Sequence, residues 1–205
     1  FSWLFSATMP DEIQKIIKKY MSPSAVRVAV NPESLVNENI SHQYIKTTIK
    51  EKTDLIIKFL EKRPNDRGII FCRTKAGTQN LTEQLKEEGF SVEALEGNMQ
   101  QKERDRAMRI FKKCLISTDV SARGIDVNNL AFVIHHQLPE QLEYYTHRSG
   151  RTARAGKTGF SLALVLPYEL EQIQKIQKDL NIKFNEISFF YGFNLCLRSP
   201  IQLIG

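Results

Sequence analysis

The sequence predicts an α/β fold in which a parallel sheet carries helices on both faces. Three observations lead to this expectation. Short strand-like runs alternate with amphipathic helical segments from about residue 43 to residue 166. Residues 68–72 are apolar throughout, which is typical of a strand buried on both faces. Polar residues follow directly after several runs, at the strand ends where ligands bind in such sheets.

Six segments have the composition and length of strands. The first alternates apolar and polar residues, and the other five are short and mostly apolar. They cover residues 43–48, 68–72, 92–95, 114–117, 131–135 and 159–166.

Helices are predicted between these strands because apolar residues recur there at helical spacing. Leu55, Ile56 and Phe59 share one face of the first helix, and Leu81 and Leu85 share one face of the second. Gly89 is the expected cap of the second helix. The predicted helices cover residues 52–62, 76–89, 102–111, 140–148 and 168–180.

Two terminal regions lie outside this pattern. Residues 1–42 contain a short predicted strand at 3–5, a helix over 11–20 and a polar loop over 31–41. Because the chain begins with Phe1 inside an apolar run, we expect a piece of a longer protein. Residues 188–205 are mostly apolar; they could form an edge strand, pack on a neighbour or be foreign to the natural protein.

Composition and charge are those of a globular domain. Apolar residues make up 41% and charged residues 25%, and the net charge of +6 is compatible with a polyanionic partner without establishing one. The widely separated Cys72, Cys114 and Cys196 indicate neither a disulfide framework nor a metal site. No apolar run reaches the ~20 residues of a membrane span. We therefore expect a cytoplasmic location and no membrane partner.

The most informative polar segment covers residues 147–154. It contains His147, Arg148, Arg151 and Arg154. If the segment is helical, Arg151 and Arg154 share a face, with His147 one turn earlier. Clustered guanidinium groups repel one another unless an anion binds them, and their planar forks suit phosphoryl oxygens. The segment therefore indicates phosphoryl chemistry.

A second polar segment covers residues 117–126, directly after a predicted strand. Thr118 can donate a hydrogen bond to a phosphate oxygen, and Asp126 can accept hydrogen bonds from a sugar hydroxyl. Its glycine permits close backbone approach to a ligand. An alternative of about equal weight is that Asp119 and Arg123 form a structural salt bridge in a turn.

In this order, five motifs resemble those of the DEAD-box RNA helicases, a branch of the superfamily-2 helicases. The resemblance covers about residues 1–187. The similar segments are Ser6-Ala7-Thr8 (motif III), residues 69–75 (motif IV), Gln101 with Arg104 (Gln-x-x-Arg), residues 117–126 (motif V) and residues 147–154 (motif VI). His147 stands where DEAH-type relatives carry Gln, which favours RNA over DNA.

The resemblance implies a RecA-like second helicase domain over residues 43–187. Residues 1–42 are then the end of the first RecA-like domain and the linker, and residues 188–205 stay unassigned. In this family two such domains close over ATP and RNA crosses both. The first domain of the same protein and RNA are therefore the expected partners, and ATP with Mg²⁺ the expected cofactor.

The resemblance also assigns roles to single residues. Arg151 and Arg154 become arginine fingers for the γ-phosphate, and His147 is expected to contact the Ser-Ala-Thr loop. The implied ATP-binding residues are Gly124, Asp126, Arg151 and Arg154. The implied RNA-binding residues are Thr74, Gly97, Arg104, Thr118 and Gly124. The implied interdomain coupling residues are Ser6, Thr8, Gln101, Arg123 and Arg148.

The sequence also departs from the family pattern. It has neither a Gly-x-x-x-x-Gly-Lys-Ser/Thr loop nor an Asp-Glu-Ala-Asp run, so we expect the magnesium ligands in the first domain and no ATP hydrolysis by this chain alone. Glu96 and Asn98 replace the family's usual His and Asp. Between Lys113 and Cys114 the loop is either shortened or missing residues, and we favour missing residues. A stand-alone RNA- or protein-binding module and a DNA translocase are the alternatives.

Overall fold

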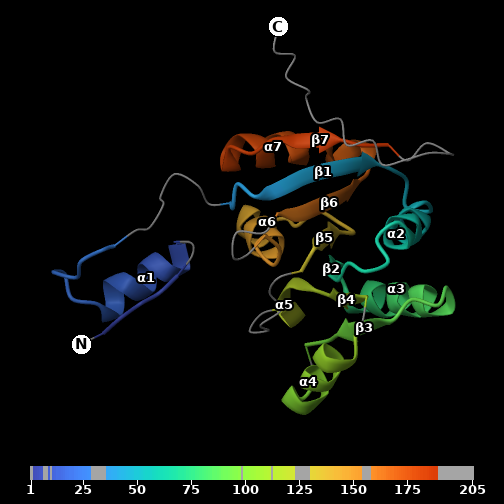
Figure 1. Cartoon of the computed structure of the whole chain (residues 1–205). Coiled ribbons are helices and arrows are strands. Elements are labelled where there is room, and N and C mark those ends of the chain that lie inside the picture. Colours follow the sequence, from blue (N-terminus) through green and yellow to red (C-terminus); the bar gives the residue numbers. More distant parts are fainter. Residues whose placement is uncertain are drawn as a thin grey trace, which may run out of the picture. The chain divides into compact units, whose positions relative to one another are not determined.

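The computed structural model describes residues 2–6, 9, 11–28, 36–97, 99–111, 113–122, 130–153 and 158–188. The chain divides into two compact units, Phe1–Leu35 and Val36–Gly205. The smaller unit contains helix α1 (Asp11–Tyr20), as predicted, and Figure 1 shows the ribbon of both units. The strand predicted at 3–5 is wrong, since the described residues 2–6 form no strand.

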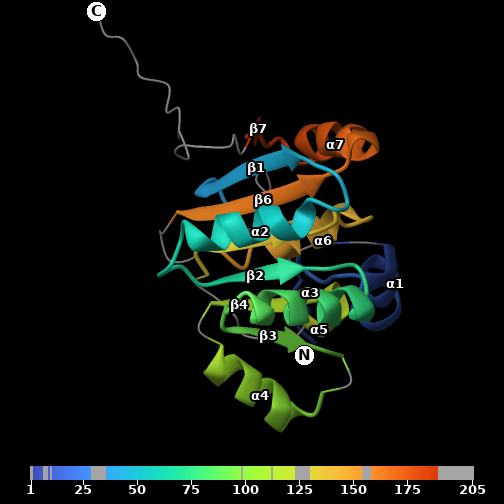
Figure 2. The ribbon, with the colours of Figure 1, turned by 90° about the vertical axis from the view of Figure 1, so that its right-hand side faces the viewer.

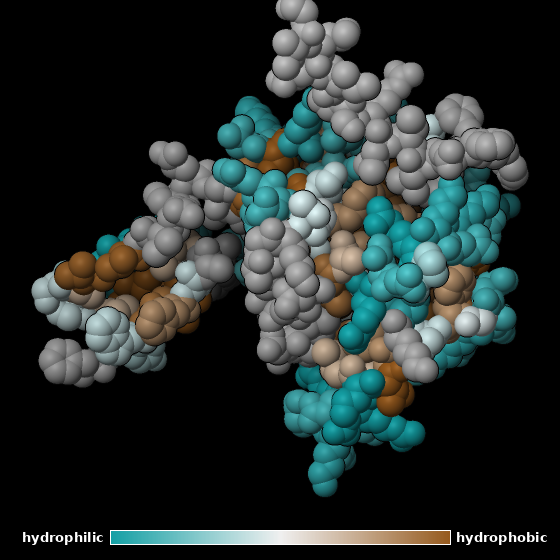
Figure 3. Space-filling model, in the orientation of Figure 1, coloured by the Kyte–Doolittle hydropathy of each residue, from teal (hydrophilic) through white to brown (hydrophobic). Residues whose placement is uncertain are grey.

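The apolar side chains of the smaller unit lie largely at its surface. Trp3 is 80% exposed and Phe5 90%, and Val26 and Val28 are also exposed. Figure 3 shows this unit with apolar side chains over much of its visible face. An apolar run becomes a strand only where another strand accepts its backbone hydrogen bonds. The described part of this unit has no such strand, which explains the wrong prediction at 3–5.

The larger unit is built on a seven-stranded sheet in the order β3-β4-β2-β5-β6-β1-β7. All neighbouring strands are parallel, which confirms the predicted fold class. The strands are β1 (Ile40–Lys46), β2 (Gly68–Phe71), β3 (Val92–Leu95), β4 (Cys114–Ser117), β5 (Phe132–His135), β6 (Gly159–Val165) and β7 (Phe184–Glu186).

Helices cover both faces of this sheet, as predicted. Helices α2 and α3 lie on one face, and α5, α6 and α7 lie on the other (Figures 1 and 2). The helices are α2 (Lys52–Glu61), α3 (Lys75–Glu87), α4 (Gln101–Ile110), α5 (Asp119–Ala122), α6 (Leu142–Ser149) and α7 (Leu170–Leu180), with a 3₁₀ turn η1 (Pro167–Glu169) before α7.

The core has a layer on each face of the sheet because side chains alternate along each strand. On β2, Ile70 packs with Phe59 of α2 and Leu85 of α3. Ile69 and Phe71 point to the opposite face and pack with Ala122 of α5. A strand with apolar residues on both faces is what the uninterrupted run at 68–72 predicts.

Several boundaries differ from prediction. β1 begins at Ile40 rather than at residue 43, and the predicted helix over 168–180 is divided into η1 and α7. Neither α5 nor β7 was predicted. Gly89 follows α3 with φ of 82°, a left-handed conformation that glycine adopts without strain, which confirms it as the cap.

Two cysteines are buried without a disulfide, as their apolar surroundings predict. Cys72 and Cys114 are both almost fully enclosed. Burial raises the pKa of the Cys72 thiol to about 12 and also raises that of Cys114, so both stay protonated near neutral pH. Within the described part of the chain, no helix has the length and apolar composition to span a membrane.

Candidate nucleotide and nucleic-acid site

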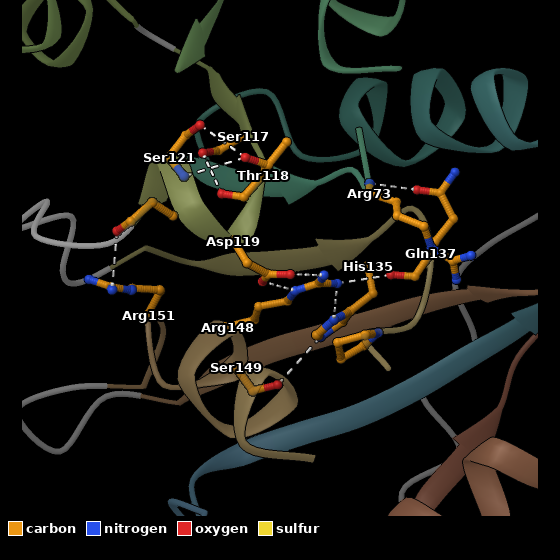
Figure 4. Close-up of polar contacts among 12 residues, drawn as sticks. Arg73, Ser117, Thr118, Asp119, Ser121, His135, Gln137, Arg148, Ser149 and Arg151 are labelled. Carbon is orange, nitrogen blue, oxygen red and sulfur yellow. Dashed lines mark hydrogen bonds and ion pairs between the residues drawn. The ribbon is translucent and has the colours of Figure 1, made fainter. Parts of the chain in front are cut away.

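Hydroxyl groups gather where β4 leaves the sheet and α5 begins (Figure 4). The Thr118 hydroxyl lies 2.9 Å from that of Ser121, and the Ser121 amide donates to Thr118 Oγ1 at 3.4 Å. This is helix-capping geometry, in which a hydroxyl accepts from an amide of the first turn. Ser117 is fully buried and donates its hydroxyl to the Thr118 carbonyl at 3.0 Å. The segment is therefore held rigidly at the carboxyl edge of the sheet.

Two other predicted RNA-binding residues, Arg104 and Gly97, also lie close to Ser121. Arg104 on α4 donates from Nη2 to the Ser121 carbonyl at 2.5 Å. A Cβ atom at Gly97 would lie 3.7 Å from the Ser121 hydroxyl, so the backbone at Gly97 is also close. Gly97, Arg104 and Thr118, far apart in sequence, thus lie around a single serine.

Thr74 lies at the same edge of the sheet, after the neighbouring strand β2. Phe71 and Ser117 are register partners, and the Cys72 amide donates to the Ser117 carbonyl at 2.9 Å. Thr74 is the N-cap of α3, where its hydroxyl oxygen accepts from the Gly77 amide at 3.0 Å. Carboxyl ends of parallel strands meet at one edge, as the sequence predicted for these motifs.

Arg148, which is buried, makes an ion pair with the partly buried Asp119 (Figure 4). Its Nε lies 2.6 Å from Asp119 Oδ1 and its Nη2 lies 2.7 Å from Oδ2, while its side chain is only 3% exposed. Nη1 donates to the Gln137 carbonyl at 2.9 Å, and the guanidinium carbon lies 5.0 Å from the Phe71 ring centre. The carboxylate that was considered for a pair with Arg123 is therefore bidentately bound by Arg148.

Arg151 lies beyond the end of α6, not on it. The helix ends at Ser149 with Gly150 as its cap, and Thr152 then forms a parallel bridge with Leu130. The condition for Arg151 to share a helical face with His147 is therefore not met, because the α-helix ends at Ser149 and tight turns follow, in which the Arg151 amide donates to the Arg148 carbonyl at 3.1 Å and the Thr152 amide to the Ser149 carbonyl at 3.2 Å. Arg151 Nη2 lies 3.4 Å from the Ala122 carbonyl at the end of α5.

The remaining predicted site residues are dispersed or lie outside the described residues. His147 is exposed on α6. Gln101 is exposed on α4 and donates to Asp105 of its own helix at 2.8 Å, and Ser6 belongs to the smaller unit. Those outside the described residues are Thr8, Arg123, Gly124, Asp126 and Arg154, together with Asn98.

Sequence reasoning missed the residues that support the site from within the sheet. His135 at the end of β5 and Ser161 on β6 are fully buried, and Tyr145 of α6 packs against them. The signal was available, because each polar residue lies in an otherwise apolar strand run. Burial lowers the pKa of His135 well below its usual value, and the charge of Arg148 lowers it further.

A pocket of about 530 Å³ lies beside α4 and β3 but does not suit a phosphate. Glu93, Glu96 and Glu103 line it, with Arg106 as its cation. Carboxylates repel phosphate oxygens, and two of these are already bound, by Lys86 and by the Gln79 amide. The hydroxyls and arginines at the ends of β4 and α6 are the better phosphate site.

Comparisons with known proteins agree with this geometry. The family model for the helicase conserved C-terminal domain matches residues 51–156. The chain is 35% identical over 188 residues to the DEAD-box ATP-dependent RNA helicase CshA of Geobacillus kaustophilus, covering 90% of this chain and 40% of that protein. It is 37% identical over 190 residues to the probable ATP-dependent RNA helicase MJ0669 of Methanocaldococcus jannaschii, covering 91% and 50%.

Solved structures show the same similarity. A DEAD box protein from the hyperthermophile Methanococcus jannaschii superposes with a TM-score of 0.68 at 36% identity, over 90% of this chain and 50% of that one. Dbp5 of S. cerevisiae bound to RNA and ADP BeF3 superposes with a TM-score of 0.79 at 30% identity, over 89% and 50%. The chain thus spans 40% and 50% of the lengths of these two curated relatives.

Proposed function

Because this chain belongs to the DEAD-box ATP-dependent RNA helicases and carries their C-terminal helicase domain, we propose that it completes an ATPase site and part of an RNA-binding surface. The ion pair between Arg148 and Asp119 is the observation that carries this proposal. It ties α6 to α5 and so keeps Arg151 beside the hydroxyl cluster at the carboxyl edge of β4.

Arg151 and Arg154 are proposed to act on the γ-phosphate of ATP. A guanidinium group stabilises the charge that develops on the transferring phosphoryl group, and such a finger can contribute about 10³–10⁵ in rate. Support comes from Arg151, which reaches the Ala122 carbonyl directly before the segment that contains Gly124 and Asp126. Those two residues are proposed to contact the nucleotide, with Asp126 on the ribose.

The magnesium ion that accompanies ATP is assigned to ligands outside this chain. Hydroxyls and guanidinium groups make up the site described above, and guanidinium groups repel a cation. The Asp119 carboxylate is already bound by Arg148. The sequence also has no phosphate-cradling Gly-rich loop with Lys and Ser/Thr. The triphosphate and its metal would therefore be held mainly by the first domain.

RNA is proposed to cross the hydroxyl cluster around Ser121. Thr74, Gly97, Arg104, Thr118 and Gly124 would contact phosphates and sugars, which carry no base sequence. Bending one strand there would prevent it from staying paired and so separate a short duplex. His147, exposed on α6, would contact the Ser6-Ala7-Thr8 loop, and Gln101, Arg123 and Arg148 would transmit domain closure.

The test is RNA-stimulated ATP hydrolysis by the complete protein. We expect Arg151→Ala and Arg154→Ala each to lower the rate about 10³-fold or more, because each removes charge stabilisation of the transition state. Arg109→Ala is the matched control, since Arg109 is an exposed arginine on α4 outside the site. If both finger variants stay within a few-fold of the wild type, the finger assignment is wrong.

A further inference from the structure

A row of buried polar side chains crosses three neighbouring strands beneath α6. His42 on β1 and Ser161 on β6 are register partners, and His135 stands on the next strand, β5. All three are at most 5% exposed. The face of α6 that covers them is also polar, and the residues on it are Tyr145, Arg148 and Ser149. Their spacing of three and four positions places them on one side of the helix.

Hydrogen bonds connect this row without a break from α5 to β1. His135 Nδ1 lies 3.4 Å from Arg148 Nη1, and His135 Nε2 lies 3.1 Å from the Ser161 hydroxyl. The Ser161 hydroxyl lies 3.3 Å from that of Tyr145, which lies 2.6 Å from His42 Nδ1. Arg148 joins the row to Asp119, as Figure 4 shows for Asp119, Arg148 and His135.

The guanidinium group fixes the tautomer of the His135 ring. Arg148 has only donors, so His135 Nδ1 must accept and cannot carry a proton. A neutral ring then carries its proton on Nε2, which donates to Ser161. The remaining hydrogen bonds of the row can run in the same donor-to-acceptor direction: the Ser161 hydroxyl donates to the Tyr145 hydroxyl, and the Tyr145 hydroxyl donates to His42 Nδ1.

We propose that His135 is a positioning residue that, as a neutral ring protonated on Nε2, sets the rotation of α6 and hence the placement of His147 and Arg151. The hydrophobic effect is non-directional, whereas a hydrogen bond requires its donor and acceptor to be aligned, so hydrogen bonds restrict the rotation of a helix beyond what apolar packing does. The row offers α6 directional partners on β5 and β6. Because Arg148 also binds Asp119, the rotation of α6 and the position of α5 are set together.

Two substitutions separate the chemistry of His135 from its volume. His135→Asn puts an amide oxygen near the position of Nδ1, so it keeps an acceptor for Arg148. His135→Leu puts an apolar side chain of similar size there and removes the acceptor. Ile176→Ala is the matched control, because Ile176 is 3% exposed on α7 in the core of the same face but outside the row.

The functional part of the inference rests on the proposed function and is tested by RNA-stimulated ATP hydrolysis of the complete protein. We expect His135→Leu to lower kcat about ten- to a hundredfold with the KM for ATP within about threefold, as for misplaced transition-state contacts. His135→Asn should restore kcat to within about threefold of the wild type. Ile176→Ala should lower the unfolding temperature and leave kcat within about threefold.

The outcomes distinguish the two proposals. If Arg151→Ala lowers kcat and His135→Leu behaves like Ile176→Ala, the positioning inference is wrong while the proposed function stands. If Arg151→Ala and Arg154→Ala both have no effect in the same assay, the finger assignment in the proposed function fails. A kcat of His135→Asn as low as that of His135→Leu also overturns the positioning inference.

Nuclear magnetic resonance of this chain tests the tautomer independently of any activity. The sequence has four histidines, so single substitutions assign their ring nitrogens readily. At pH 7 we expect the ¹⁵N shifts of His135 to show an unprotonated Nδ1 and a protonated Nε2. A cationic ring, or a ring protonated on Nδ1 alone, would contradict the proposed network.

Discussion

Arg148 and Arg151 lie three positions apart and bind different partners. Arg148 is 3% exposed, and its charge is acceptable in the core because a carboxylate, a carbonyl and a ring nitrogen bind it. Arg151 is only partly buried and contacts a backbone carbonyl at 3.4 Å. A group that must meet a phosphate needs access, and a group that fixes geometry needs enclosure. The degree of burial thus distinguishes the roles of two arginines that lie in the same short sequence segment.

His42, at the far end of the polar row, makes the stability of the chain depend on pH. Burial lowers its pKa to about 4, whereas an unfolded histidine titrates near 6.5. The unfolded state therefore binds a proton at a higher pH than the folded state does. The contribution of the neutral ring is complete above pH 6.5 and declines as the pH falls towards 4. We expect this group to remove about 3 kcal/mol from the free energy of unfolding over that range.

The measurement is urea unfolding of the wild type and of His42→Asn at several pH values. Asn can still accept from Tyr145 but does not titrate, so the difference in stability between the two proteins isolates the ring. The titratable groups facing His42 are Tyr145 of α6, whose raised pKa keeps it neutral over this range, and His135 of β5, whose pKa burial lowers and which both proteins retain. Parallel stability curves for the two proteins would show that His42 does not titrate as its burial requires.

At the scale of elements, burial on both faces made the central strands predictable. The apolar runs of β2, β4 and β5 were placed within one residue of their observed bounds, and so was β3 at the edge of the sheet. The four residues of α5 are too few to show a helical period, and β7 contributes only Phe184 to the core. The parallel bridge between Thr152 and Leu130, just after α6, was not predicted either. These three features depend on tertiary partners that local sequence does not contain.

The candidate site, too, could be predicted from the sequence only in part. Its motif residues could be chosen from the sequence because hydroxyls and arginines follow strands. Their pairing could not be predicted, since Asp119 and Arg148 are 29 positions apart and a closer arginine, Arg123, is available as an alternative. The fold brings α5 and α6 together and so puts Arg148 in contact with Asp119, and this proximity is a property of the folded chain.

The N-terminus of α3 gives a prediction about a single element. Thr74 has an extended backbone and its hydroxyl oxygen accepts from the Gly77 amide at 3.0 Å. Removing such a cap costs about 0.5–2 kcal/mol. We expect Thr74→Ala to lower the free energy of unfolding by about 1 kcal/mol and Thr74→Ser to leave it nearly unchanged, as measured by chemical denaturation. Equal stability of the two variants would show that the cap contributes nothing.

At the scale of the whole molecule, the chain combines a complete sheet domain with a small unit whose apolar side chains are exposed. The larger unit has helices on both faces of its sheet and a core layer on each. In the smaller unit, Trp3, Phe5 and Tyr20 are all more than half exposed. The family's two-domain architecture accounts for both properties if the smaller unit is the end of the first domain. RNA binding by this chain alone should then reflect only part of the surface used by the complete protein.

That partial surface leads to a prediction about salt. Affinity that comes from phosphate contacts falls with salt because each neutralised phosphate releases a counterion, with a slope of about −0.7 per contact on a single strand. We expect this chain to bind single-stranded RNA weakly, with steep salt dependence and little difference between unrelated sequences. Arg104→Ala should reduce the slope of log K against log salt by about 0.7, measured by fluorescence anisotropy, because it removes one cationic contact at the Ser121 cluster.

Arg109→Ala is the control, because Arg109 lies exposed on the same helix, away from Ser121. The two variants lose the same charge, so a difference in slope between them measures location and not net charge. If both change the slope equally, the contact is a general attraction to the basic chain. Tight binding that does not respond to salt would instead favour a stand-alone RNA-binding module, since counterion release could not be its source of affinity.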